Sequence, residues 1–163
     1  MNADSICRKL EELQRRNMDL EGILRSAVEY LHESNPRFQW TGIYELFPDN
    51  VLRLGPFIGA PTDHVFIAVG QGVCGAAVAE GRTMNVPDVS KAPNYLACST
   101  ATKSELVVLI RKGSRILSQI DIDSHELDAF DPTTVIEVEK LANWLAEAYS
   151  AHHRSRHAAG SVV

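Results

Sequence analysis

The sequence predicts one domain of the α+β class, in which an antiparallel sheet carries helices from both ends of the chain on one face. Three observations lead to this prediction. Apolar residues recur at helical spacing over residues 4–32 and again after Asp131. Between these regions, short strand-like segments alternate with turn residues. The chain has 163 residues, of which 45% are hydrophobic; this suffices for one well-filled core but is short for two domains.

Composition and charge argue against several classes of protein. A net charge of −5 and a pI near 5.6 disfavour a surface for nucleic acid or anionic membrane, which would need a basic patch. No apolar run approaches the length of a membrane span, and the opening M-N-A-D-S differs from a secretion signal. The three cysteines are too few for a disulfide scaffold and lack C-x-x-C zinc spacing. We therefore expect a soluble, cytoplasmic protein with no nucleic-acid or membrane partner and no bound metal or cofactor.

The N-terminal region, residues 4–32, predicts two helices. The polar segment 17–19 interrupts the apolar pattern, and Asp19 is a suitable N-cap for a second helix. Cys7 lies on the amphipathic first helix, so we interpret it as structural.

The C-terminal region predicts one further helix. Asp131 and Pro132 are typical of the N-cap and the first helical position. The last residues show no apolar periodicity. We therefore predict a single domain over residues 1–152 and a disordered tail over 153–163.

Six segments of the middle region predict strands, and a short helix interrupts them. A turn at 48–50 separates the first two strands, and a short connection containing Gly113 joins the last two. The short helix is expected at 73–80, before Gly81. The strands are expected at 40–47, 51–57, 65–69, 83–86, 105–111 and 115–123.

The last of these strands contains Q-I-D-I-D-S, in which isoleucine and aspartate alternate. Period two places Ile120 and Ile122 on one face and Asp121 and Asp123 on the other, roughly 7 Å apart along the strand. If the helices cover the isoleucine face, the aspartates face the loops between residues 59 and 104. There they are either ordinary solvated acids or the lining of a pocket.

Other residues with reactive or aromatic side chains are expected near the two aspartates. Cys98 lies in L-A-C-S-T-A-T-K-S-E among small polar residues, which is not the setting of a buried structural cysteine. Glu105 opens the strand that pairs with the aspartate strand, so a register estimate places it near both aspartates. One thiol and three carboxyls therefore converge on one predicted site. Trp40 and Tyr44, in W-T-G-I-Y, share a strand face and are either core residues or an aromatic wall of this site.

Five segments, in this order, resemble the free methionine-(R)-sulfoxide reductases, which are single-domain GAF proteins. The segments are W-T-G-I-Y, L-G-P-F-I-G, V-G-Q-G-V-C-G-A-A-V-A, Y-L-A-C-S-T-A-T-K-S-E and Q-I-D-I-D-S. The similarity runs from the first of them to the final helix. It implies a GAF-like sheet of about six antiparallel strands, with the N- and C-terminal helices on one face and a loop-covered pocket on the other.

The resemblance also implies roles for the site residues. The cysteine at Cys98 would attack the sulfoxide. The acids Glu105, Asp121 and Asp123 would hold the substrate and assist protonation of its oxygen, and the two aromatic residues would receive its methyl group. This fits the chemistry, because a thiolate attacks sulfur while an acid protonates the departing oxygen. Clustered carboxyls raise one another's pKa, so we expect at least one to be protonated. A carboxyl pair also suits the ammonium group of a free amino acid.

The sequence departs from the reductases at one position. They usually carry a further cysteine, commonly the resolving thiol, shortly before V-G-x-G-V-C-G, and His64 occupies that position here. Cys74, within G-V-C-G, is retained and is either a small core residue or the resolving thiol. Because Cys74 is the remaining internal thiol that could resolve an oxidised Cys98, we predict a Cys74–Cys98 disulfide after one turnover.

Two functions from different classes remain. One is thiol-dependent reduction of free L-methionine-(R)-sulfoxide, with Cys98 as nucleophile and electrons from NADPH through thioredoxin reductase and thioredoxin. The other is a non-catalytic GAF module that binds or senses a small molecule and has lost the resolving cysteine. The lack of an output domain favours the enzyme, and His64 favours the module. The oligomeric state stays open, a homodimer included.

Overall fold

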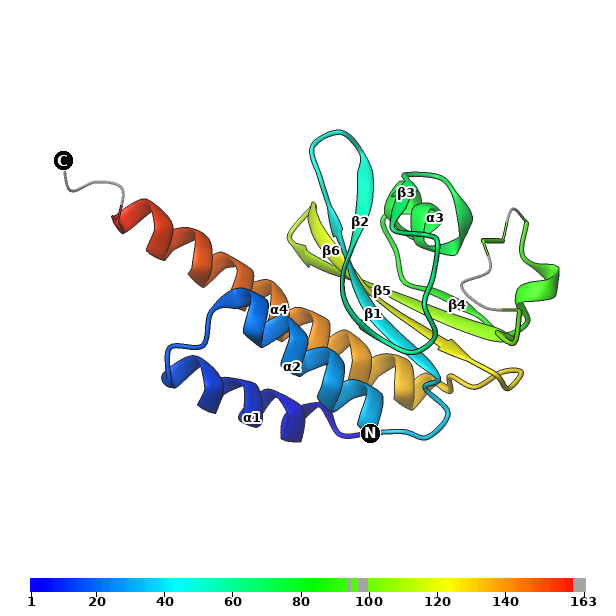
Figure 1. Cartoon of the computed structure of the whole chain (residues 1–163), viewed down its shortest axis with the longest axis horizontal. Coiled ribbons are helices and arrows are strands. Elements are labelled where there is room, and N and C mark those ends of the chain that lie inside the picture. The colour runs from blue at the N-terminus through cyan, green and yellow to red at the C-terminus, as the bar shows by residue number, and fades with distance from the viewer. Residues whose placement is uncertain (94, 97–99, 160–163) are drawn as a thin grey trace.

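The computed structural model describes residues 1–93, 95–96 and 100–159, with the backbone alone over 153–159. The predicted helices and strands are all present in this part of the chain, and the strand bounds agree to within one residue. A 3-10 turn, η1, was not predicted. In chain order (Figure 1) the elements are α1 (Ala3–Arg15), α2 (Leu20–Glu33), β1 (Trp40–Leu46), β2 (Val51–Ile58), β3 (Phe66–Ala68), α3 (Gly72–Glu80), β4 (Met84–Val86), η1 (Val89–Lys91), β5 (Ser104–Lys112), β6 (Arg115–Ser124) and α4 (Pro132–Ala159).

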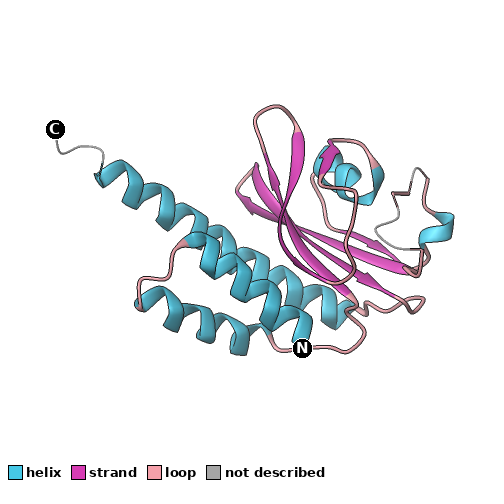
Figure 2. Cartoon of the chain, viewed as in Figure 1, coloured by secondary structure: helices cyan, strands magenta, loops and turns pink. Residues whose placement is uncertain are grey.

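The sheet is antiparallel, and its strands lie in the order β3-β2-β1-β6-β5-β4. The two central strands are therefore β1 and β6. Helices α1, α2 and α4 lie together on one side of the sheet, whereas α3 lies on the other side with the loops (Figure 2). The α+β class, the six-stranded sheet and the placement of the terminal helices are confirmed.

The main core lies between the sheet and these three helices. Ile120 and Ile122 of β6 are 1% and 0% exposed. They share one apolar cluster with Leu10 of α1, Leu31 of α2 and Leu141 of α4. Full burial of side chains of this size contributes roughly 1.5–3 kcal/mol each. The isoleucine face thus meets the helices, as predicted, and the aspartate face meets the other layer.

Three helices begin at a side-chain N-cap; Asp19 and Asp131 are the caps expected from the sequence, and Asn2 was not predicted. Asn2, Asp19 and Asp131 each accept a hydrogen bond from the backbone N–H three residues further on. The break between the first two helices is completed by Asn17, whose φ of 61° lies in the left-handed region that asparagine tolerates. These contacts confirm the predicted starts of α2 and α4.

The end of α4 differs from the prediction. The helix continues to Ala159, so the disordered tail predicted over 153–163 is wrong for residues 153–159. The segment H-H-R-S-R-H-A-A lacks apolar periodicity, but it contains no helix breaker before Gly160 and includes good helix formers. In Figure 1 this end of α4 projects beyond the sheet. No helix in the described part of the chain, α4 included, is both long and apolar enough to cross a membrane.

Candidate active site

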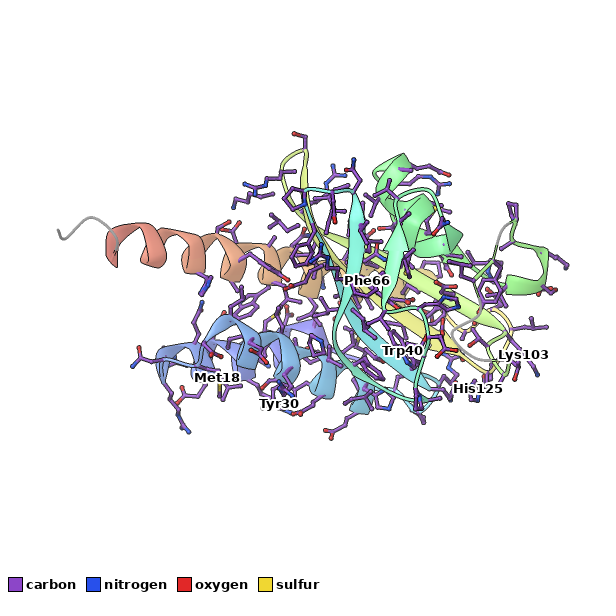
Figure 3. All side chains as sticks on the ribbon, turned by 45° about the horizontal axis from the view of Figure 1, so that its top comes forward. Met18, Tyr30, Trp40, Phe66, Lys103 and His125 are labelled. Carbon is purple, nitrogen blue, oxygen red and sulfur yellow. The ribbon has the colours of Figure 1, made fainter. Side chains whose placement is uncertain are left out.

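Three adjacent strands place predicted site residues in one row. β5 pairs Glu105 with Asp123 of β6, and β1 pairs Trp40 with the same aspartate. Asp121 follows two residues away along β6, on the same face. Figure 3 shows Trp40 near the end of the sheet at which Lys103 lies. The register estimate that brought Glu105 to the two aspartates is confirmed.

Trp40 and Tyr44 form an aromatic pair beside this row. Their stacked rings have centroids 6.2 Å apart, and the residues are 3% and 0% exposed. Gly42 makes room for the indole, because a Cβ at this position would lie 2.4 Å from Cη2 of Trp40. The indole N–H donates to the carbonyl O of Ala60 at 3.1 Å, which ties the ring to the loop after β2. The shared face is confirmed, while contact with a ligand stays a prediction.

The three acids of the row, Glu105, Asp121 and Asp123, are buried. Their exposed fractions are 4%, 0% and 1%, respectively. None of the ion pairs within the described residues includes them. In the same part of the chain, neither oxygen of Asp121 nor Oδ1 of Asp123 has a hydrogen-bond partner of ordinary geometry. Thr102 Oγ1 donates to Oδ2 of Asp123 at 3.3 Å. The alternative of a solvated strand face is therefore wrong.

Burial moves all three acids toward their protonated forms. Burial raises the pKa of Glu105 well above its ordinary value, and the negative charges of Asp121 and Asp123 raise it further. Burial also raises the pKa of Asp121 to about 7, although the Cys74 thiol and the Glu105 carboxyl oppose this as weak hydrogen-bond donors. The pKa of Asp123 is raised first by burial and then by the charge of Asp121. Burial and the neighbouring charges thus favour the protonated form of Glu105 most clearly, in the direction of the expectation that at least one acid is protonated.

Helix α3 brings Cys74 to the same acids. Its Sγ and carboxylate oxygens of Glu105 and Asp121 all lie within 4.8 Å of one another, and the residue is 4% exposed. Gly75 permits this close packing, because a Cβ there would lie 2.5 Å from the carbonyl O of Ala68. The three ligand atoms lie close enough together for a divalent metal, which thiols and carboxylates bind, although burial raises the pKa of both carboxyls and so favours their protonated forms. From the sequence, Cys74 is either a core residue or the resolving thiol. The structure shows in addition that its thiol lies beside the acids.

Cys98, the predicted nucleophile, lies outside the described residues. The chain before it packs on α3, since Cγ of Leu96 is 3.0 Å from the position that a Cβ at Gly72 would take. The chain after it reaches the acids through the hydrogen bond from Thr102 to Asp123. Both flanks therefore contact the site, and the role of Cys98 stays a prediction.

His64 lies in the loop between β2 and β3. Its carbonyl O accepts a hydrogen bond from the Tyr44 hydroxyl at 2.8 Å. The position at which the reductases usually carry a further cysteine is thus fixed against the aromatic pair.

Gln119 is a polar residue of this face that the sequence reasoning did not use. It is 0% exposed, and neither Nε2 nor Oε1 has a hydrogen-bond partner among the described residues. On β6, Gln119 lies two residues before Asp121 on the same face, opposite Tyr44 of β1 and Leu109 of β5. A signal was available, because period two in Q-I-D-I-D-S extends the aspartate face to the glutamine.

Two large hollows lie away from this row. One, of about 800 Å³, lies between α2, β2 and the last turns of α4. The other, of about 680 Å³, lies between α3, β4 and η1. Neither hollow is lined by any predicted site residue that the structure describes.

Comparison with known proteins gives relatives of two kinds. The GAF domain family model matches residues 19–149. GAF domain-containing protein A from Dictyostelium discoideum is 43% identical over 94 residues, which are 58% of this chain and 59% of that protein. Free methionine-R-sulfoxide reductase from Saccharomyces cerevisiae is 42% identical over 106 residues, which are 63% of this chain and 58% of that protein. The chain therefore spans less than two thirds of the length of both curated relatives.

A solved structure extends the similarity over nearly the whole chain. It is the X-ray structure of free methionine-R-sulfoxide reductase from Neisseria meningitidis in complex with its substrate. The TM-score is 0.86 at 30% identity, and the match covers 94% of this chain and 91% of that chain. Sequence and fold lead to one assignment: the chain belongs to the GAF domain family, among the proteins of the free methionine-R-sulfoxide reductase family.

Proposed function

We propose that this protein reduces free L-methionine-(R)-sulfoxide to methionine, with Cys98 as the nucleophile. The observation that supports this most is the row of buried acids, Glu105, Asp121 and Asp123, beside the aromatic pair. Such a row can both hold a cation and deliver a proton. The relatives from S. cerevisiae and N. meningitidis carry the name of this activity.

In the proposed reaction, the Cys98 thiolate attacks the sulfoxide sulfur while Glu105 gives its proton to the sulfoxide oxygen. Attack joins Sγ of Cys98 to the substrate sulfur, which then carries the protonated oxygen. The oxygen next moves to Sγ: the Sγ–O bond forms, the substrate sulfur loses its bonds to oxygen and to Sγ, methionine leaves, and Cys98 becomes a sulfenic acid. The substrate gains two electrons and Cys98 loses two. Glu105 suits this step because burial and the charges of the two aspartates raise its pKa and so favour the form that can give up a proton.

The two aspartates are assigned to the substrate's ammonium group. Asp121 and Asp123 are buried without an ion-pair partner among the described residues, so an ammonium would supply the missing positive charge. Its arrival favours their ionised forms, because an opposite charge nearby lowers the pKa of a carboxyl. Trp40 and Tyr44 then receive the methyl group. A peptide-bound methionine sulfoxide has no free ammonium, so the site prefers the free amino acid.

Turnover requires that the sulfenic acid be reduced again. We assign this to Cys74, which condenses with the oxidised Cys98, releases water and forms a disulfide. The two Cα atoms must come within about 7 Å for this bond. Thioredoxin then reduces the disulfide with electrons from NADPH and thioredoxin reductase, a system that fits a cytoplasmic location.

Replacing Cys74 by serine should separate the first turnover from the later ones. We expect Cys74→Ser to produce one equivalent of methionine and then to lose thioredoxin-driven cycling, because no internal thiol remains to resolve Cys98. Peptide mapping of wild type without reductant, after one equivalent of substrate, should reveal the Cys74–Cys98 disulfide. If Cys74→Ser cycles normally, an external thiol reduces Cys98 directly, and Cys74 has only a structural role beside the acid row.

The free energy of unfolding should fall as the pH rises through the titration of Asp121. Its pKa increases from 3.8 to about 7 on folding, so the folded state binds more protons between these values. The contribution of Asp121 to the free energy of unfolding is fully present below pH 3.8 and is lost as the pH rises past about 7. For this one group, the loss in the free energy of unfolding is on the order of 4 kcal/mol. Denaturant unfolding should find wild type less stable at about pH 8 than at about pH 5.

A matched pair of variants tests the origin of this pH dependence. Asp121→Asn should reduce the difference between the two pH values, because the titrating group is gone. Asp49→Asn changes an exposed aspartate that pairs with Arg53 and should leave the difference as in wild type. Equal differences in wild type and Asp121→Asn would contradict the assignment.

A second candidate function is a GAF module that binds a small molecule without turning it over. His64 favours it, since this position is fixed at the aromatic pair and lacks a thiol. NADPH consumption with thioredoxin, thioredoxin reductase and each methionine sulfoxide diastereomer distinguishes the two functions. Consumption with the (R) form alone supports the reductase. Binding of the sulfoxide without single-turnover methionine formation supports the module.

A further inference from the structure

The carboxamide of Gln119 is buried on the same face of β6 as the acid row. It lies between Tyr44 and Leu109, its partners on the neighbouring strands. The Leu109 side chain has no polar atom. The hydroxyl of Tyr44 donates to the carbonyl O of His64. Both ends of the amide are buried and unpartnered among the described residues.

A buried carboxamide in this state destabilises the folded protein. The amide loses its hydrogen bonds to water and gains none in return, whereas an apolar side chain of the same size would avoid that loss. Buried polar groups are nearly always partnered, so an exception calls for a partner that arrives later. Gln119 lies two residues from Asp121 on the same face of β6. Its amide is therefore placed to meet whatever the acid row binds.

The chemistry of the row selects which atom of the substrate meets Gln119. An ammonium requires an anionic partner, which Asp121 and Asp123 supply. A carboxylate would be repelled by these acids once they are ionised. A sulfoxide oxygen is neutral and accepts hydrogen bonds, and Glu105, whose carboxylate lies within 4.8 Å of Asp121, must also reach it to protonate it.

We propose that Gln119 determines specificity for the oxidised substrate, with Nε2 donating a hydrogen bond to the sulfoxide oxygen. This inference rests on the proposed function and deepens it. The product methionine has no such oxygen, so its binding leaves the amide unpartnered again. Sites built to hydrogen-bond a substrate group discriminate strongly against an analogue that lacks the group. Gln119 thus favours binding of the sulfoxide and release of the thioether.

The test compares affinities for substrate and product when turnover is blocked. In a Cys98→Ser background, calorimetry measures binding of methionine-(R)-sulfoxide and of methionine, with and without Gln119→Met. Methionine is close to glutamine in shape and lacks the amide. We expect the preference for the sulfoxide over methionine to fall about tenfold or more, with methionine affinity nearly unchanged. The melting temperature of the ligand-free protein should rise, because an unpartnered buried amide is removed.

Leu109→Met is the matched control, since it changes an apolar side chain opposite Gln119 and removes no hydrogen-bonding group. It should keep the sulfoxide preference. An unchanged preference in Gln119→Met, or a lower melting temperature without a loss of preference, overturns the inference. Reduction by the wild-type protein is assayed separately. Selective binding through Gln119 without reduction overturns the proposed function alone, and reduction with an unchanged preference in Gln119→Met overturns the inference alone.

Discussion

Cys98→Ser should abolish formation of methionine from methionine-(R)-sulfoxide, even in a single turnover with excess protein. A serine hydroxyl is a far weaker nucleophile toward sulfur at neutral pH, and it has no route to a sulfenic acid. The measurement is rapid quenching and chromatography of methionine after mixing with substoichiometric substrate. Full activity in Cys98→Ser would remove the basis of the reductase proposal.

Cys7→Ser is the control for this experiment. Cys7 lies on α1, on the helical side of the sheet, where burial, followed by the charges of Glu11 and Asp4, raises the pKa of its thiol to about 11. It therefore stays protonated and unreactive at neutral pH. Cys7→Ser should react as wild type does.

Glu105→Gln should lower kcat/KM for the sulfoxide by on the order of 10²–10⁴, the usual effect of removing a positioned general acid. The amide has the shape of the carboxyl but cannot give up a proton at neutral pH. Steady-state kinetics with the (R) diastereomer measures the change. Because burial favours the uncharged form of Glu105 and the amide is also uncharged, we expect the free energy of unfolding to change little, so lost activity would not reflect lost structure.

The two aspartates provide the companion variants. Asp121→Asn and Asp123→Asn should also reduce efficiency, through weaker binding of the ammonium as well as slower proton transfer. A combined result in which Glu105→Gln and both aspartate variants match wild type would show that the row has only a structural role.

The local pattern of β6 made much of the site predictable. Alternation in Q-I-D-I-D-S separates the core face from the site face, and the short connection at Gly113 fixes the register that brings Glu105 to Asp123. Both inferences need only period two and a tight hairpin.

Other features depend on packing between distant segments. The close approach of Gly75 to β3 helps to bring Cys74, rather than another residue of α3, to the acids. The local sequence does not predict this approach. The environment of Gln119 likewise depends on where the neighbours' polar groups point, so the pattern shows its face but not its lack of partners. Apolar periodicity does not predict the helix over residues 153–159, because intrinsic helix propensity suffices to form it there.

The acids on the central strand β6 have an evolutionary consequence. Each of Asp121, Asp123 and Glu105 occupies a place where a neutral or apolar residue would suit the fold better. In a lineage that no longer needed the chemistry, selection would no longer retain them, because a neutral or apolar residue of similar size avoids the desolvation of a buried acid. We therefore expect orthologous chains that have drifted to a new use to lose all three together.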